Sequence, residues 1–363
     1  LAKEIAGEKI VTTRRYQELL DNKEIDCIIN ATPDHWHKQI VVDCCNAGKD
    51  VYCEKPMSHT VADGAAMVEA MKKSGRIVQV GSQRTSSSIC AKARELLQQG
   101  VIGELSLVEA QLGRNDPTGA WQYPPPPDLS PETLDWETWL GTAPRVPFNP
   151  LHYARWRCWK EYGTGVAGDL MVHLLSGMTM ALGINEMPGR AQAAGGIFRF
   201  KDGRNMPDVH TVLFEYGELP VYVRLTLGTE TPETVRFHGS KGILELAPMQ
   251  VTVSPQAGID RVPSYYANSF PKALREEYFR KWREENAEKL KPIQMAGETF
   301  KGPNYDDGRP HMAGFFEAVR TRKPVFQDAL FGHHAAGACH MANEAYFRKT
   351  PVVWDAASQS IKS

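Results

Sequence analysis

The sequence predicts an α/β protein in which a parallel sheet built from βαβ units is followed by an α+β domain with a mainly antiparallel sheet. Over residues 1–84 short apolar strands alternate with helices, and connections this short are typical of right-handed βαβ units in a parallel sheet. Beyond this point, consecutive apolar–polar alternating segments are separated by Gly and Pro, which favours antiparallel strands with one covered face. We therefore expect two domains, residues 1–84 and 85–363.

The first domain is expected to hold three strands and the helices that connect them. The strands are predicted at 25–31, 50–53 and 76–80, and the helices at 35–46 and 61–73. Each helix stops at a glycine, which is a common C-terminal signal. Ligands of such sheets lie at the carboxyl ends of the strands. Those ends carry Thr32, Pro33, Glu54, Lys55, Pro56, Gln83 and Arg84.

The second domain is expected to begin with a helix at 91–99 and an alternating strand at 104–110. A loop rich in proline and aromatic residues follows over 115–159, and repeated strands occupy 189–253. Helices are predicted again at 272–290, 312–322 and 333–347. On the first of these, Leu274, Tyr278 and Trp282 form an i, i+4, i+8 stripe, which indicates a covered helix or a subunit contact.

Charge and composition exclude several classes of partner. Among 363 residues, 42 Lys and Arg balance 43 Asp and Glu, so there is no electrostatic reason to expect nucleic acid or an anionic membrane as the main partner. No apolar run reaches the ~18 residues of a membrane-spanning helix, so we expect no membrane insertion. Seven scattered cysteines do not resemble a disulfide framework and are expected to be buried, reduced thiols.

A glycine-rich run at 163–168 (GTGVAG) matches the dinucleotide fingerprint G-x-G-x-x-G letter for letter. The true fingerprint follows an apolar strand, because its glycines let the backbone approach a pyrophosphate there. The residues before this run (WRCWKEY, 156–162) do not form such a strand. We therefore interpret the run as a flexible approach to the next helix, where a ligand can also come close.

Three residues near these features suit proton transfer. Asp169 and His173 are spaced i, i+4, which places both side chains on one face of a helix. A nearby carboxylate can fix the tautomer of an imidazole and raise its basicity. Lys55, in Glu54-Lys55-Pro56, stands at the carboxyl edge of the parallel sheet, where an ammonium can orient a hydroxyl or share its proton. The alternatives are a capping Asp, a core His and a solvated loop Lys.

Asp34-His35-Trp36-His37 contains the metal-ligand spacing His-x-His. No cysteine or carboxylate cluster completes a ligand set, and a loop beside a nucleotide site explains the segment equally well. We therefore expect no metal.

Taken in order, these segments resemble the Gfo/Idh/MocA family of NAD(P)-dependent oxidoreductases, typified by glucose–fructose oxidoreductase and inositol dehydrogenase. The segments that carry the resemblance are 31–37 (ATPDHWH), 47–56 (AGKDVYCEKP), 163–173 (GTGVAGDLMVH), 136–141 (WETWLG), 148–150 (FNP) and 354–355 (WD). The similarity runs from Tyr16 to Asp355. The first segment resembles a bacterial branch with many exported members, often associated with sugars and glycosides.

The resemblance implies roles for individual residues. Lys55 matches the family's E-K-P lysine near nicotinamide and the substrate hydroxyl, and Asp169 and His173 match its second catalytic pair. The cofactor would be NAD or NADP, with NAD favoured. Residues implied to border it are Thr32, Pro33, His37, Glu54, Lys55, Gln83 and Arg157. The aromatic residues expected to stack against a sugar, with interdomain packing as the alternative, are Trp121, Tyr123, Tyr153 and Trp156.

The resemblance also implies that the open antiparallel sheet mediates a homodimer or homotetramer. Members of the family begin with a strand, a Gly-rich turn, a helix and a second strand that ends in an acidic residue, whereas this chain starts at Leu1-Ala2-Lys3-Glu4. The resemblance thus makes residues 1–84 the C-terminal part of a Rossmann-type domain that precedes a large, open antiparallel sheet. We expect the whole protein to carry the N-terminal nucleotide-binding piece, with any export signal, ahead of Leu1. A cytoplasmic location and a periplasmic one reached by twin-arginine export both remain open.

The function expected from the sequence is NAD(P)-dependent oxidation of a secondary hydroxyl of a sugar or glycoside, with hydride passing to nicotinamide and the proton to His173, aided by Lys55. The first alternative is a glycoside-cleaving enzyme that oxidises its substrate transiently, eliminates the aglycone and regenerates its own NAD. The second is a non-catalytic binding or assembly protein with the same fold.

Overall fold

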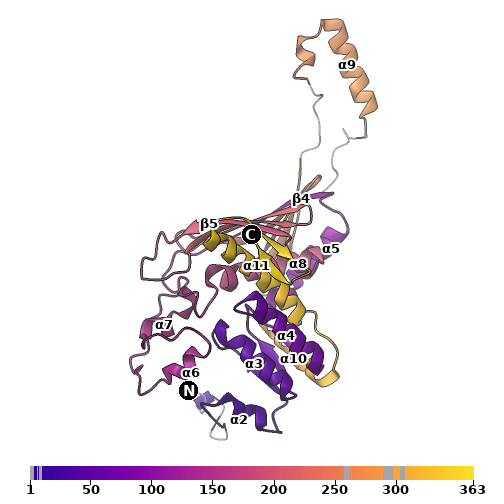
Figure 1. Cartoon of the computed structure of the whole chain (residues 1–363). Coiled ribbons are helices and arrows are strands. Elements are labelled where there is room, and N and C mark those ends of the chain that lie inside the picture. The colour runs from indigo at the N-terminus through magenta and orange to yellow at the C-terminus, as the bar shows by residue number, and fades with distance from the viewer. Residues whose placement is uncertain are drawn as a thin grey trace.

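The computed structural model describes residues 4–5, 7, 10–256, 262, 264–288, 297–302 and 307–363. Within these residues the strands form two sheets, one of three strands and one of ten. In Figure 1 the larger sheet runs across the middle of the picture, and the helices of the N-terminal region lie below it. The expected combination of a parallel sheet with a larger, mainly antiparallel one is confirmed.

The smaller sheet consists of β1 (Cys27–Asn30), β2 (Asp50–Cys53) and β3 (Val78–Val80), in that order. Both pairings are parallel, with Cys27 opposite Asp50 and Val51 opposite Val78. The strands are buried runs joined by helices, as the sequence predicts. The helices of this region are α2 (Tyr16–Asp21), α3 (Asp34–Asn46) and α4 (Val61–Ser74).

The larger sheet alternates buried and exposed residues along its strands, which is the pattern of a sheet with one covered face. From edge to edge it contains β11 (Glu298–Lys301), β10 (Gln250–Pro255), β9 (Gly242–Ala247), β8 (Thr231–Gly239), β4 (Leu105–Gly113), β7 (Leu219–Thr226), β6 (Val209–Tyr216), β5 (Arg190–Gly196), β12 (Val352–Asp355) and β13 (Ser360–Lys362). In this sheet β4 and β7 run parallel, and the other neighbouring strands run antiparallel.

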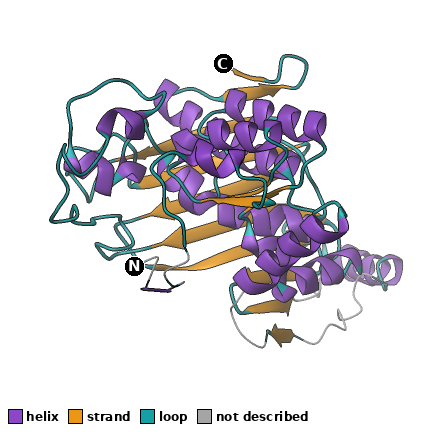
Figure 2. Ribbon diagram, turned by 90° about the horizontal axis from the view of Figure 1, so that it is seen from below, coloured by secondary structure: helices purple, strands orange, loops and turns teal. Residues whose placement is uncertain are grey.

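Helices cover one face of this sheet. They are α5 (Ser88–Gln98), α8 (Val172–Leu182) and α11 (Ala329–Arg348), and Figure 2 shows them across the long strands when the molecule is seen from below. The main hydrophobic core lies between these helices and the sheet, with Phe214 and Phe237 fully buried. The site described below therefore rests on a rigid, densely packed layer.

The C-terminal region returns to the parallel sheet. Helix α10 (Gly308–Thr321) places the Phe315 ring 5.7 Å from that of Tyr52 in β2, and Arg322, just beyond the helix, is paired with the buried Asp50. The predicted boundary near residue 84 stays a prediction, because later segments also pack on the first sheet.

The proline- and aromatic-rich loop contains short helices that the sequence did not indicate: α6 (Trp136–Leu140), α7 (Pro150–Ala154) and the 3-10 turn η2 (Trp156–Cys158). Asp135 and Asn149 cap the two α-helical turns through their side chains, which is the usual role of Asx residues at such positions. This stretch is therefore ordered, and it brings Trp156 and Arg157 to a fixed place.

Helix α9 (Lys272–Glu285) follows the 3-10 turn η4 (Ala267–Ser269), and in Figure 1 it projects away from the large sheet. None of its residues is buried, and Leu274 of the predicted stripe is 57% exposed. The interpretation as a helix covered within the chain is wrong, because no residue of the helix is buried, although the Phe270 ring beside η4 packs edge-on against Tyr278 at 6.0 Å. A subunit contact stays a prediction.

The seven cysteines are all free, and all but the half-buried Cys27 are buried, which confirms the expected reduced thiols. In the part of the chain that the structure describes, no helix combines the length and apolar character needed to cross a membrane.

Candidate active site

Lys55 links the end of the parallel sheet to the turn before α8. It follows β2, in a segment whose Lys55–Pro56 peptide bond is cis. Its Nζ donates hydrogen bonds to the backbone oxygen of Asp169 at 2.9 Å and to Asp169 Oδ1 at 3.0 Å. The Lys55 side chain is only 15% exposed, so the alternative of a solvated loop lysine is excluded.

Asp169 lies in a π-helical turn, Ala167–Met171 (η3), that leads into α8. Its Oδ1 accepts a second hydrogen bond at 3.0 Å, from Arg157 Nε. Burial alone would raise the pKa of this carboxyl, but the ion pairs with Lys55 and Arg157 hold it well below its ordinary value. Asp169 is therefore a permanent anion shared by two cations.

His173 is the second residue of α8 and is half-buried. Burial, followed by the nearby charge of Lys55, lowers its pKa from 6.5 to about 3. The imidazole is therefore neutral near pH 7 and can accept a proton. It also borders a small cavity between α8 and the large sheet.

The expected pairing of Asp169 with His173 needs correction. Within the described residues the Asp169 carboxylate bonds to Lys55 and Arg157, and no hydrogen bond links it to His173. The expectation assumed a regular α-helix through both residues, whereas Asp169 lies in a π-helical turn with i→i+5 bonding. Asp169 still raises the pKa of His173 electrostatically, but burial and Lys55 outweigh it.

The glycine run before α8 serves the packing of the chain itself. A Cβ on Gly168 would lie 1.8 Å from Thr164 Oγ1 and 3.0 Å from Pro56 Cγ. Thr164 in turn donates to the buried Asp34 through its backbone N–H at 3.1 Å and its hydroxyl at 2.7 Å. The run follows η2 and not a strand, so rejecting the dinucleotide fingerprint is correct. Thr164 and Pro56 fill the space beside Gly168, whereas Gly163 and Thr164 line a cavity together with residues of α4 and α11.

Several residues implied to border a cofactor meet at the carboxyl ends of the three parallel strands. Thr32, Glu54 and Gln83 follow β1, β2 and β3, and all three are half-buried. Pro33 is the residue before α3. A Cβ on Gly81 would lie 2.8 Å from Glu54 Oε2 and 3.1 Å from the Tyr52 hydroxyl oxygen, so the Glu54 carboxylate packs directly against this glycine.

His37 is the exception in this group. It is 1% exposed, and its ring bridges the carbonyl oxygens of Thr32, 2.8 Å from Nε2, and Pro56, 2.9 Å from Nδ1. We therefore correct its expected role from cofactor contact to support of the loops after β1 and β2. His35 is tied in the same way, with Nε2 2.9 Å from the Trp139 oxygen. Among the described residues no group of three or more His, Cys, Asp or Glu is placed to hold a metal ion.

Comparison with known proteins finds a family match in the N-terminal part of the chain. Residues 2–82 match the sequence profile GFO_IDH_MocA, described as an oxidoreductase family with an NAD-binding Rossmann fold. The match covers the region of the parallel sheet, and this part of the chain is similar to the Gfo/Idh/MocA oxidoreductases.

Curated relatives match over the N-terminal part of the chain. It is 37% identical over 87 residues to 2,7-anhydro-N-acetylneuraminate hydratase of Escherichia coli, which is 24% of this chain and 23% of the relative. It is 34% identical over 104 residues to inositol 2-dehydrogenase 1 of Saccharopolyspora erythraea, which is 28% of this chain and 31% of the relative. The matched stretch thus spans about a quarter to a third of these curated relatives.

Solved structures extend the likeness of fold over nearly the whole chain. Levoglucosan dehydrogenase in complex with NADH and levoglucosan aligns with a TM-score of 0.66 at 16% identity, over 97% of this chain and 85% of that one. An inositol dehydrogenase homologue of Azotobacter vinelandii complexed with NADH and myo-inositol aligns with a TM-score of 0.62 at 16% identity, over 93% and 81%. At these identities the likeness shows the fold alone.

Four aromatic residues were expected to stack on a sugar, and they lie in different environments. Trp121 is 3% exposed and belongs to the core, so the packing alternative holds for it. Tyr153 is half-buried, with its ring 5.7 Å from that of Trp139. Tyr123 is 38% exposed. Trp156 is half-buried, and the Arg157 guanidinium lies 4.1 Å from its ring centroid, so Trp156 is the member next to the Asp169 cluster.

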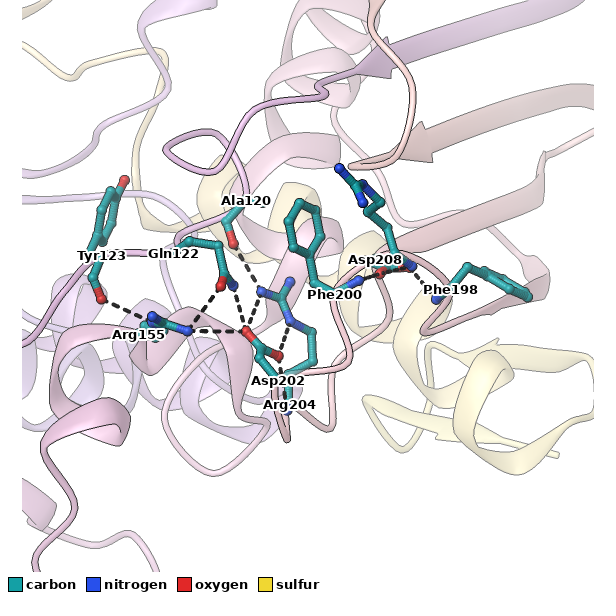
Figure 3. A network of polar contacts seen from close by, with 10 residues as sticks. Ala120, Gln122, Tyr123, Arg155, Phe198, Phe200, Asp202, Arg204 and Asp208 are labelled. Carbon is teal, nitrogen blue, oxygen red and sulfur yellow. Dashed lines mark hydrogen bonds and ion pairs between the residues drawn. The ribbon is translucent and has the colours of Figure 1, made fainter.

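Figure 3 shows a polar network that fixes the loops carrying these aromatic residues. Asp202 forms a two-point ion pair with Arg204, at 2.8 and 2.9 Å, and lies 3.5 Å from Arg155. Arg155 also donates to Gln122 Oε1 and to the Tyr123 carbonyl, both at 3.0 Å. The network therefore ties the 120–123 loop to the segment that holds Trp156 and Arg157.

The base of this network is a single buried carboxylate. Asp208 is fully buried and accepts hydrogen bonds from the backbone N–H groups of Phe198, Arg199 and Phe200 at 2.7–2.8 Å. These bonds fold the loop that presents Asp202.

The sequence did not single out Arg84 as a functional residue beyond its place at a strand end. Arg84 is 7% exposed, pairs with Glu233 of β8 and lies 3.5 Å from Asp307. With His173 it lines the small cavity described above, and its charge contributes to the lowered pKa of His173. The feature of the sequence that could have identified Arg84 is its position just after a parallel strand.

Proposed function

We propose that this protein catalyses the NAD(P)-dependent oxidation of a secondary hydroxyl of a sugar or glycoside. The observation that carries the proposal is the cluster of Lys55, Asp169 and Arg157 beside a neutral His173. It combines a fixed cation and a proton acceptor at the carboxyl edge of a parallel sheet, where such folds bind their ligands.

The residues at this edge fit the nicotinamide end of a dinucleotide. Thr32, Glu54 and Gln83 are half-buried polar side chains that follow neighbouring strands, and the Glu54 carboxylate packs against Gly81. When bound, nicotinamide supplies the acceptor for a hydride from the substrate carbon. NAD is favoured over NADP because the structural neighbours named above are complexes with NADH.

Lys55 is arranged to hold the hydroxyl that reacts. Its ammonium has three protons, and Asp169 accepts hydrogen bonds at its backbone oxygen and Oδ1. The remaining proton can be donated to the substrate oxygen. Because Asp169 and Arg157 fix the position of Lys55, this donor is already oriented before substrate binds.

His173 is the proposed proton acceptor. As the alcohol carbon loses hydride, the hydroxyl oxygen must lose its proton to give a ketone. A neutral imidazole can take that proton, and the low pKa of His173 keeps it neutral. Lys55 stabilises the negative charge that develops on the same oxygen.

The experiment combines the full-length protein with NAD+ or NADP+ and a panel of sugars and glycosides, and follows NADH or NADPH. Lys55→Ala and His173→Ala should each lower kcat by roughly 10²–10⁴, whereas Lys73→Ala, on the exposed side of α4, should leave it unchanged. Aglycone release without net NADH would favour transient oxidation with elimination. Absence of saturable NAD(H) binding would favour a non-catalytic protein.

We also propose that the uncovered face of the large sheet mediates a homodimer or homotetramer. Leu213 of β6, Tyr222 of β7 and Val353 of β12 are 41%, 38% and 41% exposed on this sheet. Light scattering should give a dimer or tetramer mass, and Leu213→Lys with Tyr222→Lys should shift it toward the monomer.

A further inference from the structure

Arg114 lies at the edge of the candidate active site but takes no part in the cluster described above. It directly follows β4, in which Val108, Ala110 and Leu112 are buried under the helices. Side chains alternate between the faces of a strand, so Arg114 continues this inward row toward α8 and His173. Its backbone N–H donates to the Thr226 oxygen of β7 at 2.9 Å, which fixes the position of this residue.

The Arg114 side chain is half-buried and packs on Gly119, whose Cβ would lie 2.8 Å from Arg114 Cδ. In the described part of the chain its guanidinium has neither a hydrogen-bond acceptor nor an ion-pair partner. Asp116, the nearest acid in sequence, instead accepts the Gly119 N–H at 2.6 Å. A half-buried guanidinium without an anion loses hydration and gains no hydrogen bond in return.

The other charges of the site do not compensate Arg114. Lys55 and Arg157 share the single carboxylate of Asp169, and Arg84 is paired with Glu233 and Asp307. The charge of Arg114 reaches the reaction centre, because it contributes with Lys55 and Arg84 to the lowered pKa of His173. The space around His173 therefore holds one cation that no acid of the described chain neutralises.

We propose that the substrate is a sugar acid whose carboxylate pairs with Arg114, while the hydroxyl to be oxidised lies between Lys55 and His173. This inference rests on the proposed function and narrows it to a substrate class. Arginine binds a carboxylate through two parallel hydrogen bonds, so Arg114 would select the acid and also orient its ring. In this reaction the carboxylate is unchanged. The secondary alcohol loses one hydride to nicotinamide and one proton to His173.

The test uses matched substrates that differ only at one carbon: methyl glucuronide against methyl glucoside, and galacturonate against galactose. With the full-length protein and NAD+, kcat/KM should be about 10- to 100-fold higher for the acid of the productive pair. Arg114→Gln should abolish this preference and leave kcat/KM for the neutral sugar within a few-fold. Arg114→Lys, which keeps the charge, should retain part of it.

Controls separate the ways in which the inference can fail. Arg190→Gln removes an exposed arginine of β5 and should change nothing, and thermal melts should show that each Arg114 variant is folded. Preference for the neutral sugar would overturn the inference and leave the proposed function standing. A weaker affinity of Arg114→Gln for NADH, with the acid preference intact, would assign Arg114 to a cofactor phosphate. No turnover of any pair would overturn both proposals.

Discussion

The Lys55 ammonium lies 3.0 Å from Asp169 Oδ1 and 2.9 Å from the Asp169 backbone oxygen. One lysine at the end of a parallel strand is thus held by both the side chain and the main chain of a turn that leads into α8. Because both hydrogen bonds come from the same residue, the distance between the nucleotide-binding region and His173 depends on this contact.

Replacing Asp169 tests that dependence. Asp169→Asn leaves Lys55 and Arg157 without their shared anion, so we expect a loss of stability of about 3 kcal/mol. Misplacement of Lys55 should lower kcat on the order of 10²-fold. Urea denaturation and steady-state kinetics measure the two effects. Asp169→Glu keeps the charge and should recover part of both, and equal behaviour of the two variants would contradict the role of the carboxylate.

The sequence predicts those parts of the site whose pattern is set locally along the chain. Hydrophobic runs closed by glycine located the strands and helices that present Thr32, Glu54 and Lys55, because burial sets that pattern locally. The π-helical turn at Asp169 has no such pattern, since it depends on how Thr164, Gly168 and Pro56 pack. The sequence therefore named Asp169 and His173 but assigned Asp169 the wrong partner.

Residues that act through distant partners were harder to predict. Arg84 pairs with Glu233, 149 positions away, and Asp202 reaches Gln122 across 80 positions. Packing of turns and loops that are far apart in the sequence creates these contacts, since Arg84 lies in the turn after β3 and Gln122 and Asp202 lie in loops. No spacing along the chain indicates them. Burial likewise separates Trp121 from Trp156, although both lie in the same aromatic loop.

The pH dependence of catalysis should reflect the environment of His173. Its pKa is lowered from 6.5 to about 3 by burial and by Lys55, so the proton acceptor stays neutral well below pH 6.5. We expect kcat/KM to show no loss from this group between about pH 7.5 and about pH 5, over the range in which circular dichroism shows the protein folded. A tenfold fall per pH unit below about 6.5 would mean that the acceptor has an ordinary pKa.

Stability should depend on pH through other buried histidines. Burial lowers the pKa of His35, His210 and His333 from 6.5 to about 4, and that of His340 to about 3. Each group therefore binds its proton more tightly in the unfolded chain. Their contribution to the free energy of unfolding is fully present above about pH 6.5 and is lost as pH falls toward the folded values.

Chemical denaturation at about pH 7.5 and about pH 5 measures this loss. His210→Phe keeps a ring beside Tyr346, which now lies 5.5 Å away, and removes one titrating group. We expect its stability to fall less steeply with pH, by up to ~1.4 kcal/mol per pH unit. A slope identical to that of the wild type would exclude His210 from the effect.

Asp202, in the network of Figure 3, and Glu215 of β6 both pair with an arginine, but we expect their removal to have unequal effects. The Arg204 side chain is 1% exposed beside Asp202, so Asp202→Ala leaves a buried charge unpaired and should destabilise by about 3–5 kcal/mol. Arg190 and Glu215 are 46% and 44% exposed, so Glu215→Ala should change stability by less than ~1 kcal/mol. Thermal melts of the two variants under one condition give the comparison, and similar shifts would argue against a structural role for Asp202.

Replacing two glycines should have different effects: Gly168 lies in the turn before α8, and Gly177 lies within α8. A Cβ on Gly168 would lie 1.8 Å from Thr164 Oγ1, whereas one on Gly177 meets nothing closer than 3.7 Å, the sulfur of Cys90. Gly168→Ala must displace Thr164 from Asp34 and shift the turn that holds Asp169, so it should lower both melting temperature and kcat. Gly177→Ala should be neutral or stabilise α8 by up to ~1 kcal/mol, because alanine favours helix. If Gly168→Ala were as stable and active as Gly177→Ala, the packing of Thr164 against Gly168 would not position Asp169.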